Sequence, residues 1–447
     1  MTSSRAPVRR KPAAQDHRIH QQRRRRLQKE LGDGIAFIPT ALEAVRNSDA
    51  HYPYRFDSHF WYLTGFGEPE AVLVLIGGRN PRSVLFCRDK DVEREIWDGY
   101  RYGPREAQKV FGVDEAYSIS RLDAMAPELI AGHERLLHPV GARADFDQRV
   151  SGWLAAVRAK VRSGVKAPSE FADVRALIDD MRLVKDRSEL ATMQRAATIA
   201  GQAHIRAMLA TRPGMNECEI EAELLHEFRR HGAQAPAYTS IVAGGPNACV
   251  LHYVDNNADL RDGDLLLIDA GCELDGYASD ITRTFPVNGT FSPAQRACYD
   301  VVLESQAAAI RAVKPGAPFT AYHQAAVKVL AQGMIDLKLL KGPVDRVIES
   351  GDYRRFYMHR TGHWLGLDVH DVGSYADGSK PRRLEQGNVL TVEPGLYIRP
   401  DAKVPREFWN IGIRIEDDVL VTAEGRKVLS EATPKSADAI EALMANA

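Results

Sequence analysis

The sequence predicts a two-domain protein that is α/β in its first third and α+β in the rest. Residues 34–90 alternate short apolar runs with turns, which is typical of strands in a sheet. A long stretch with helical spacing follows at 170–210. Beyond it come a strand-rich segment, a helical segment and a second strand-rich segment. Because strands and helices do not alternate one by one there, we expect an α+β domain.

Length and composition indicate an ordinary globular chain. It has 447 residues, 44% of them hydrophobic and 27% charged, which suffices for two or three domains. The formal charge of −1 provides no overall field for nucleic acid or anionic lipid, so we expect neither partner. The five cysteines form no CxxC pair, which favours a reducing, cytoplasmic location. The longest aliphatic runs fall far short of the roughly 20 residues of a membrane span.

The N-terminus is unusually basic. Residues 1–29 contain RRRR at 23–26, and Asp16 is their one acid. No apolar core follows, which excludes a secretory signal. A mitochondrial address and a nucleic-acid patch stay open. The simpler interpretation, which we prefer, is a solvated first helix with a frayed tail.

The first domain is predicted to mix strands and helices. The runs GIAFIP, FWYLTGF, AVLVLIGG and SVLFC predict strands, whereas ALEAVRNS, REAQKVFGV and VSGWLAAVRAK predict helices. The stretch SGVKAP at 163–168 combines Ser, Gly and Pro and predicts a linker. We therefore place the two domains at 1–173 and 174–447.

The second domain is predicted to begin with helices. Residues 170–210 predict two helices that meet near 185–188, where DRSEL offers an N-cap. After a Pro-Gly break, a further helix is expected to end at Gly232. Strands are expected at 238–287 and 356–422, with helices at 293–341 between them.

Two acids interrupt an apolar hairpin in LLLIDAGCELDGYASDITRTF, residues 265–285. If the hairpin is symmetric about Leu274 and Asp275, then Asp269 and Asp280 face each other, with Cβ atoms about 4.5–5.5 Å apart. Buried like charges in that arrangement are destabilising. A cation must therefore lie between them, or one of them must stay protonated.

Other chemically reactive residues gather in the same domain. His252 lies in LHY, which we interpret as strand-like, and MHRTGHWLGLDVHDVG contains His359, His363 and His370. Glu393 ends the apolar run VLTVE. Arg414 and Glu416 share one face of the alternating strand GIRIEDDVLV.

Each feature alone has a simpler interpretation, such as a cap, a core histidine or an exposed edge, and we interpret Asp368 and Asp371 as solvated. Four acids and a histidine in segments that resemble buried strands favour a metal site over these simpler interpretations. The reason is that burying the acids without cations costs several kcal/mol each. Two divalent ions neutralise four carboxylates, and oxygen donors with one imidazole favour Mn²⁺. Such a pair binds a shared water and lowers its pKa, which creates a nucleophile.

At these residues the sequence resembles the pita-bread metallopeptidases, and most closely bacterial aminopeptidase P. The likeness extends to YPYRFDSHFWYLTGFGEPEAVLVL and EIWDGYRYG in the first domain. It implies a ribonuclease H-like first domain, a pita-bread catalytic domain, and removal of the N-terminal residue from peptides with proline in second position. The nucleophile would be a hydroxide that bridges the metals.

The resemblance also implies roles for individual residues. Asp269 would bind one metal, Asp280 and Glu416 would bridge both, and His363 and Glu393 would complete the other, with Glu393 also the candidate base. The residues implied to contact substrate, transfer protons or support a ligand are His252, His359, His370 and Arg414.

The substrate-binding residues come from both domains. Tyr375 would lie near the proline pocket, and Trp97 would reach a neighbouring subunit's site in a homodimer or homotetramer. From the sequence alone, partial burial of Trp97 within its own domain is the simpler interpretation.

The sequence departs from the resemblance in two places. The RTG between His359 and His363 is larger than expected, and Arg360 would tighten or recharge the pocket. Lys380 and Arg382 both remain candidates for a substrate-binding cation.

The alternative functions are a prolidase that cleaves X-Pro dipeptides, a non-catalytic binding protein, and a metal-independent hydrolase like creatinase. The five intact metal ligands argue against the last two.

Overall fold

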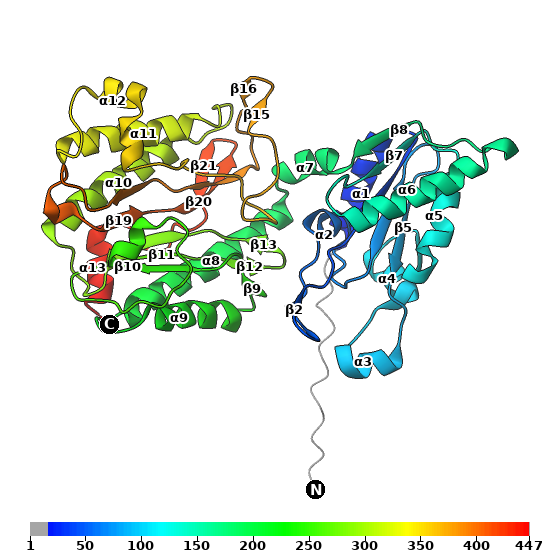
Figure 1. Ribbon diagram of the computed structural model, residues 1–447, viewed down its shortest axis with the longest axis horizontal. Coiled ribbons are helices and arrows are strands. Elements are labelled where there is room, and N and C mark those ends of the chain that lie inside the picture. Colours follow the sequence, from blue (N-terminus) through cyan, green and yellow to red (C-terminus); the bar gives the residue numbers. More distant parts are fainter. Residues whose placement is uncertain (1–16, 447) are drawn as a thin grey trace, which may run out of the picture. The chain divides into compact units, whose positions relative to one another are not determined.

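The structure is a computed structural model that describes residues 17–446, so the first part of the basic N-terminal segment lies outside the described residues. The chain divides into two compact units, the first ending at Met181 and the second beginning at Arg182 (Figure 1). The predicted boundary at 173/174 falls at the end of strand β8 (Glu170–Asp173), and helix α7 (Arg175–Leu183) follows it.

The first unit is built on a six-stranded mixed sheet in the order β6-β5-β4-β1-β7-β8. Strand β4 runs antiparallel to both β1 and β5, whereas β6, β7 and β8 join in parallel. The strands are β1 (Gly34–Pro39), β4 (Val72–Ile76), β5 (Arg82–Cys87), β6 (Glu115–Ser118), β7 (Arg135–His138) and β8. The helices are α1 (Arg18–Leu31), α2 (Ser58–Thr64), α3 (Val92–Asp98), α4 (Gly103–Phe111), α5 (Leu122–Ile130) and α6 (Ala144–Ala159). The predicted α/β class is therefore confirmed.

Three short elements of this unit were predicted wrongly. FWYLTGF forms helix α2, because Asp57 caps it by accepting from the Phe60 N–H at 2.9 Å and Gly65 ends it with φ 66°. ALEAVRNS contains strand β2 (Val45–Asn47), which pairs with β3 (Ala50–His51). Residues 170–173 form β8 rather than helix, because they pair with the edge of β7.

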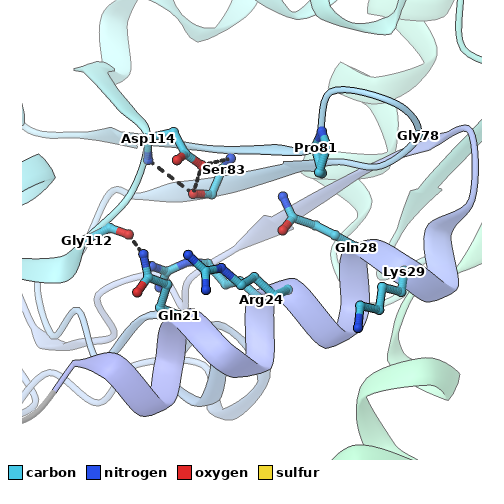
Figure 2. Close-up of a pocket in the computed structure, with 10 residues that line it drawn as sticks. Gln21, Arg24, Gln28, Lys29, Gly78, Pro81, Ser83, Gly112 and Asp114 are labelled. Atoms are coloured by element: carbon cyan, nitrogen blue, oxygen red, sulfur yellow. Dashed lines mark hydrogen bonds between the residues drawn. The ribbon is translucent and has the colours of Figure 1, made fainter.

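The RRRR segment lies in α1 and is only half solvated. Arg23 and Arg24 are buried, whereas Arg25 and Arg26 are exposed. Arg24 donates to the Leu63 carbonyl at 2.8 Å, at the C-terminal end of α2. It also donates to the Gly112 carbonyl at 2.6 Å, just after α4 (Figure 2). A cation there satisfies carbonyls that have no partner within their helices. The prediction of a fully solvated helix was therefore wrong.

The second unit packs several small sheets between helices. The central three-stranded sheets are β10-β11-β14 and β17-β20-β21, and β18 pairs with β19. In Figure 1 the strands lie between α8 and α9 on one side and α10 and α11 on the other. The helices are α8 (Arg187–Ala210), α9 (Glu217–Arg230), α10 (Pro293–Ala312), α11 (Ala321–Asp336), α12 (Val344–Ser350) and α13 (Ala437–Met444).

The strands of the second unit are short. They are β9 (Ala235–Pro236), β10 (Ile241–Gly244), β11 (Leu265–Asp269), β12 (Cys272–Leu274), β13 (Tyr277–Ala278), β14 (Thr282–Pro286), β15 (Ala376–Asp377), β16 (Lys380–Pro381), β17 (Val389–Val392), β18 (Gly395–Ile398), β19 (Ile411–Arg414), β20 (Asp417–Thr422) and β21 (Gly425–Val428). The predicted α+β class is confirmed, and so are the helix start after Asp186, which forms a capping box with Glu189, and the helix end before Gly232.

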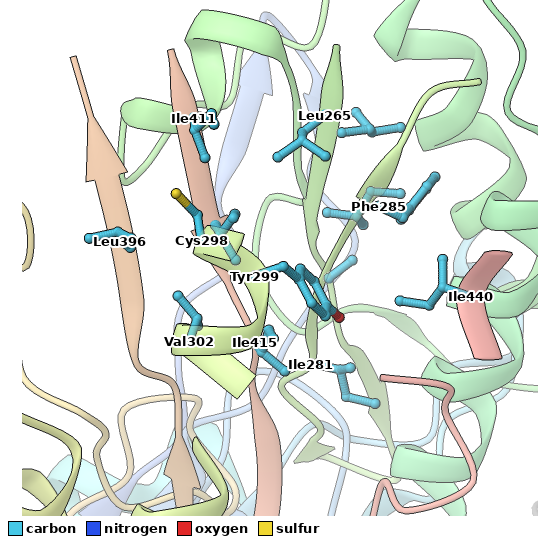
Figure 3. Packing of buried hydrophobic residues seen from close by; sticks show 14 of the residues in the cluster. Leu265, Ile281, Phe285, Cys298, Tyr299, Val302, Leu396, Ile411, Ile415 and Ile440 are labelled. Carbon is cyan, nitrogen blue, oxygen red and sulfur yellow. The ribbon is translucent and has the colours of Figure 1, made fainter. Parts of the chain in front are cut away.

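The core of the second unit supports the strand ends that carry the acids. Figure 3 shows Tyr299 of α10 packed among apolar side chains from strands and from α13, including Phe285 and Ile440. Ile413 and Ile415 belong to the same core, so Arg414 and Glu416 project from the opposite face of their segment. In the described part of the chain, no helix is long and apolar enough to cross a membrane.

Candidate metal centre

The hairpin carries Asp269 and Asp280 on one face, but in a different register from the prediction. Asp269 pairs with Thr282 across β11 and β14, and the turn is Asp275–Gly276, with φ values of 50° and 83°. The centre of the hairpin therefore lies one residue later than predicted, and the direct pairing of the two aspartates was wrong. They are diagonal neighbours instead.

A tyrosine joins the two aspartates. The Tyr238 hydroxyl lies 2.5 Å from one carboxylate oxygen of Asp269 and 2.5 Å from one of Asp280. The second Asp269 oxygen accepts from the Arg414 guanidinium at 2.8 Å. Both carboxylates are thus held in place by side chains from other segments.

His363 and Glu393 are positioned by one irregular strand pairing. The His363 N–H donates to the Thr391 hydroxyl, the Thr391 N–H donates to the His363 carbonyl, and the Glu393 N–H donates to the Thr361 carbonyl. The His363 imidazole donates from Nδ1 to the Trp364 carbonyl at 2.9 Å, which leaves Nε2 to bind a metal. Nε2 lies 3.4 Å from Asp280 Oδ2 and 3.7 Å from Glu393 Oε1.

Glu416 completes the group. It follows β19, and its N–H donates to the Thr282 carbonyl while the Thr282 hydroxyl donates to Glu416 Oε2 at 2.7 Å. Asp280, His363 and Glu416 each offer a ligand atom, and these atoms lie within 4.8 Å of one another. Segments more than a hundred residues apart therefore meet at one point.

The chemistry of this donor set fits metal ions. Asp280 and Glu416 are 5% and 1% exposed, and burial together with the neighbouring carboxylates raises the pKa of both. Burial likewise raises the pKa of Glu393 to about 7. Although burial alone would lower it, the Asp280 hydrogen bond raises the pKa of His363 to about 9. Burial disfavours the charged form of these acids, and bound divalent cations would favour it.

A buried polar chain runs from Asp269 to His359. Arg414 donates to the Tyr397 hydroxyl at 3.0 Å, and that hydroxyl lies 2.9 Å from His359 Nε2. His359 Nδ1 lies 2.7 Å from the Arg360 carbonyl and 3.8 Å from Glu393 Oε2. Burial lowers the pKa of His359 to about 4, so the ring is neutral at pH 7.

His252 and His370 lie at the exposed edge of the centre. His252 occupies a turn, so its predicted strand context was wrong. The His370 ring packs edge-on against His363, with centroids 4.3 Å apart. Burial and the charge of His363 lower the pKa of His370, and His252 contributes to the same effect.

The loop after His370 is anchored more firmly than predicted. Asp371 is buried and accepts from Arg182 at 2.6 Å and from Lys185 at 2.8 Å, so its predicted solvation was wrong. Asp368, which is partly exposed, also accepts from Arg182 at 2.8 Å. The physical reason is that two buried cations require buried acids as partners.

The predicted substrate residues have contrasting environments. Tyr375 packs parallel to Trp364 with ring centroids 5.8 Å apart, and Phe319 lies edge-on to it. Lys380 is exposed and Arg382 half-buried. Trp97 is 83% exposed on α3, which contradicts the simpler interpretation of burial within its own domain.

Sequence reasoning missed three residues of the centre: Tyr238, Thr282 and Tyr397. Tyr238 stands alone in a polar stretch, 31 residues before Asp269, and gives no periodic signal. Thr282 and Tyr397 lie in segments of strand-like composition, which gives no sign of a role at a site. Their roles depend on pairings between distant segments, which no local pattern encodes.

Comparison with known proteins identifies the class. The family model of metallopeptidase family M24 matches residues 191–423, which is more than half of the chain, so the chain belongs to this family. The model of the aminopeptidase P N-terminal domain matches residues 20–138. The predicted pita-bread catalytic domain, preceded by an aminopeptidase P N-terminal domain, is thereby confirmed.

Within this class, the relatives that match most of the chain are Xaa-Pro aminopeptidases. The Xaa-Pro aminopeptidase of Escherichia coli is 47% identical over 95% of this chain and 97% of its own. That of Haemophilus influenzae is 48% identical over 90% and 91%. Among solved structures, an aminopeptidase from Pseudomonas aeruginosa matches with TM-score 0.95 and 49% identity, over 97% of this chain and 98% of that one. Zinc-substituted Escherichia coli aminopeptidase P in complex with product matches with TM-score 0.95 and 46% identity, over 97% and 99%.

Proposed function

We propose that this chain is an Xaa-Pro aminopeptidase, which releases the first residue from peptides with proline in second position. The observation that carries the proposal is the meeting of Asp280, His363 and Glu416 in one buried cluster, with further carboxylates beside it. The likeness to Xaa-Pro aminopeptidases over nearly the whole chain supports the substrate class.

We assign two divalent metal ions to the cluster. Asp269 would hold one ion, Asp280 and Glu416 would serve both ions, and His363 and Glu393 would hold the other. We choose Mn²⁺, because a single imidazole among oxygen donors makes a hard site. A pair of divalent ions held by these residues would supply a water-derived nucleophile at neutral pH.

The surrounding side chains orient the substrate and move protons. Glu393, beside His363, is the base, and His252, His359 and His370 contact the peptide and assist proton transfer or oxyanion stabilisation. His359 is neutral at pH 7 and is fixed between Tyr397 and the Arg360 carbonyl, so its orientation needs no rearrangement. Arg414 positions Asp269 through their 2.8 Å hydrogen bond.

Recognition of proline requires an apolar wall. The bond before proline has no N–H, so its recognition depends on contact with the ring. Tyr375, braced by Trp364 and Phe319, provides one wall. We propose Trp97 as another wall, contributed by a neighbouring subunit.

We propose that the chain forms a homodimer or homotetramer. Helix α3 exposes Val92, Ile96 and Trp97 by 71%, 79% and 83%, and an exposed apolar cluster of this kind marks an interaction site. Light scattering at micromolar concentration should report an assembly, and a monomer would contradict this proposal.

We also propose a cytoplasmic location, which the unpaired cysteines of the described residues support.

The direct test is a substrate comparison with Mn²⁺-loaded protein. We expect release of the first residue from an X-Pro-X tripeptide, and much slower release from the matching X-Ala-X peptide. Equal rates on the two tripeptides would exclude the proline specificity. Cleavage of the X-Pro dipeptide alone would identify a prolidase instead.

A further inference from the structure

A second cavity adjoins the metal centre on the far side of His359. Its volume is about 440 Å³, and it lies wholly within the second unit. His359 lines it and also lies 3.8 Å from the Glu393 carboxylate, so a peptide held at the metal centre has this cavity within reach. Of the residues that line this cavity, only His359 has a substrate role assigned above.

The lining of this cavity is cationic. Arg354 and Arg360 line it, and none of its lining residues is Asp or Glu. Among the residues that the structure describes, the Arg360 guanidinium forms neither a hydrogen bond nor an ion pair, and its side chain is exposed. Arg354 is likewise exposed and lies beside the Tyr353 ring. Both guanidinium groups are therefore available to a ligand.

The inner wall of the cavity is rigid and neutral. The buried Thr361 hydroxyl lies 2.8 Å from His323 Nδ1 and 2.7 Å from the Tyr357 hydroxyl. Burial, with help from Arg354 and Arg360, lowers the pKa of His323, so that ring carries no charge at pH 7. The Thr361 carbonyl accepts from the Glu393 N–H at 2.8 Å, which ties this wall to the centre. The attraction for an anion thus comes from the two arginines.

We propose that this cavity is a subsite for a carboxylate carried by the peptide substrate, with Arg360 as its main partner and Arg354 as a second. The planar guanidinium matches a carboxylate with two parallel hydrogen bonds. The proposal rests on the proposed aminopeptidase function. The carboxylate belongs either to the C-terminus of a short peptide or to the side chain of an acidic first residue.

Two pairs of peptides distinguish these sources. One pair is an X-Pro-X tripeptide with a free C-terminus and the same tripeptide as an amide. The other pair is Glu-Pro-X amide and Gln-Pro-X amide. We expect the carboxylate member of one pair to be preferred in kcat/KM by about twofold to fivefold, as is typical of a solvent-exposed ion pair. Added salt should reduce that preference.

Substitutions at Arg360 test whether this residue causes the preference for the carboxylate peptide. The variant Arg360→Gln should bring the preference close to one, Arg360→Glu should reverse it, and Arg360→Lys should keep part of it. Arg346→Gln removes an exposed arginine of α12 that is not among the lining residues, and should keep the full preference.

Two results overturn the proposal. One is a wild-type protein that cleaves both members of each pair equally. The other is a preference that survives in the double variant Arg354→Gln/Arg360→Gln. Either result leaves the aminopeptidase function intact, because the amide peptides are still cleaved. A protein that cleaves no X-Pro-X peptide contradicts the function itself, and with it the subsite.

Discussion

Tyr238 has one hydroxyl proton and two carboxylates within 2.5 Å, Asp269 and Asp280. It donates to one of them at a time, so it orients the pair without neutralising it. Outer partners of this kind fix the direction in which a ligand oxygen points. The geometry therefore assigns Tyr238 to metal affinity rather than to contact with the peptide.

Tyr238→Phe should weaken metal binding by about 10- to 100-fold, because the two carboxylates lose their shared partner. Calorimetric titration of metal-free protein with Mn²⁺ measures this directly. Tyr299→Phe is the control, since it removes a buried hydroxyl that donates to the Lys435 carbonyl in the core. Equal metal affinity in Tyr238→Phe and wild type would contradict the assignment.

His359→Ala should separate chemistry from metal binding. His359 lies beside Glu393 but is held by Tyr397 and by the Arg360 carbonyl, so its loss should leave the metal content unchanged. We expect kcat to fall by about 10²-fold or more, as for a group that transfers a proton. Kinetics paired with elemental analysis checks both quantities. A parallel loss of metal would show that His359 supports the ligands instead.

At the scale of elements, the short link RTG between His359 and His363 ends in a glycine for a steric reason. A Cβ on Gly362 would lie 2.0 Å from the Thr391 carbonyl oxygen, so only glycine allows the two backbones to approach. That approach places His363 next to Thr391, and Glu393 follows two residues later. The glycine therefore sets the spacing between two of the proposed metal ligands.

Gly362→Ala should lower both the melting temperature and the Mn²⁺ affinity, because the backbones must separate. Thermal unfolding with and without Mn²⁺ measures both effects. Gly152→Ala provides the control: Gly152 lies in α6, where nothing stands within 4 Å of an added Cβ, so the change should be neutral or stabilising. A Gly362→Ala protein as stable as wild type would refute the role of this contact.

Helix α1 also gives the first unit a dependence on pH. His20 is buried, and its Nδ1 donates to the Tyr62 carbonyl at 3.0 Å. Burial, with the charges of Arg23, His17 and Arg24 around it, lowers the pKa of His20 to about 3. Because the unfolded chain binds this proton near pH 6.5, the free energy of unfolding should fall as the pH drops from 6.5 towards 3.

The slope from this one group is at most about 1.4 kcal/mol per pH unit. Urea unfolding between pH 7 and 5, in wild type and in His20→Gln, isolates it. We expect stability to fall less with pH in His20→Gln than in wild type. Identical pH profiles would show that His20 does not titrate with unfolding.

The long elements and the candidate metal ligands could both be proposed from the sequence, because both leave local patterns. Apolar runs and caps mark α8 and α9, and acids inside apolar strands mark Asp269 and Asp280. The hairpin register could not be predicted so well, because it depends on which two residues take positive φ, here Asp275 and Gly276. The roles of Tyr238 and of the buried partners of Asp371 could not be predicted either, because they depend on contacts between distant segments.

At the scale of the whole molecule, the second unit by itself contains the described parts of the metal centre. Asp269 and Asp280 come from one hairpin, whereas His363, Glu393 and Glu416 come from a segment that begins about 80 residues later. Helices α10 and α11 lie between them in the chain; α10 packs against β17, β18 and β19, and α11 packs against α10. The core shown in Figure 3 thus holds the two halves of the centre together.

The measurement that tests this account most directly is the metal content of protein loaded with Mn²⁺, compared between wild type and Asp280→Ala. We expect about two ions per wild-type chain, because two buried and two half-buried carboxylates require that compensation. We also expect that Asp280→Ala loses metal and nearly all activity on X-Pro-X peptides, since Asp280 serves both ions. One ion per wild-type chain, or an Asp280→Ala protein with a near-wild-type rate, would contradict the account.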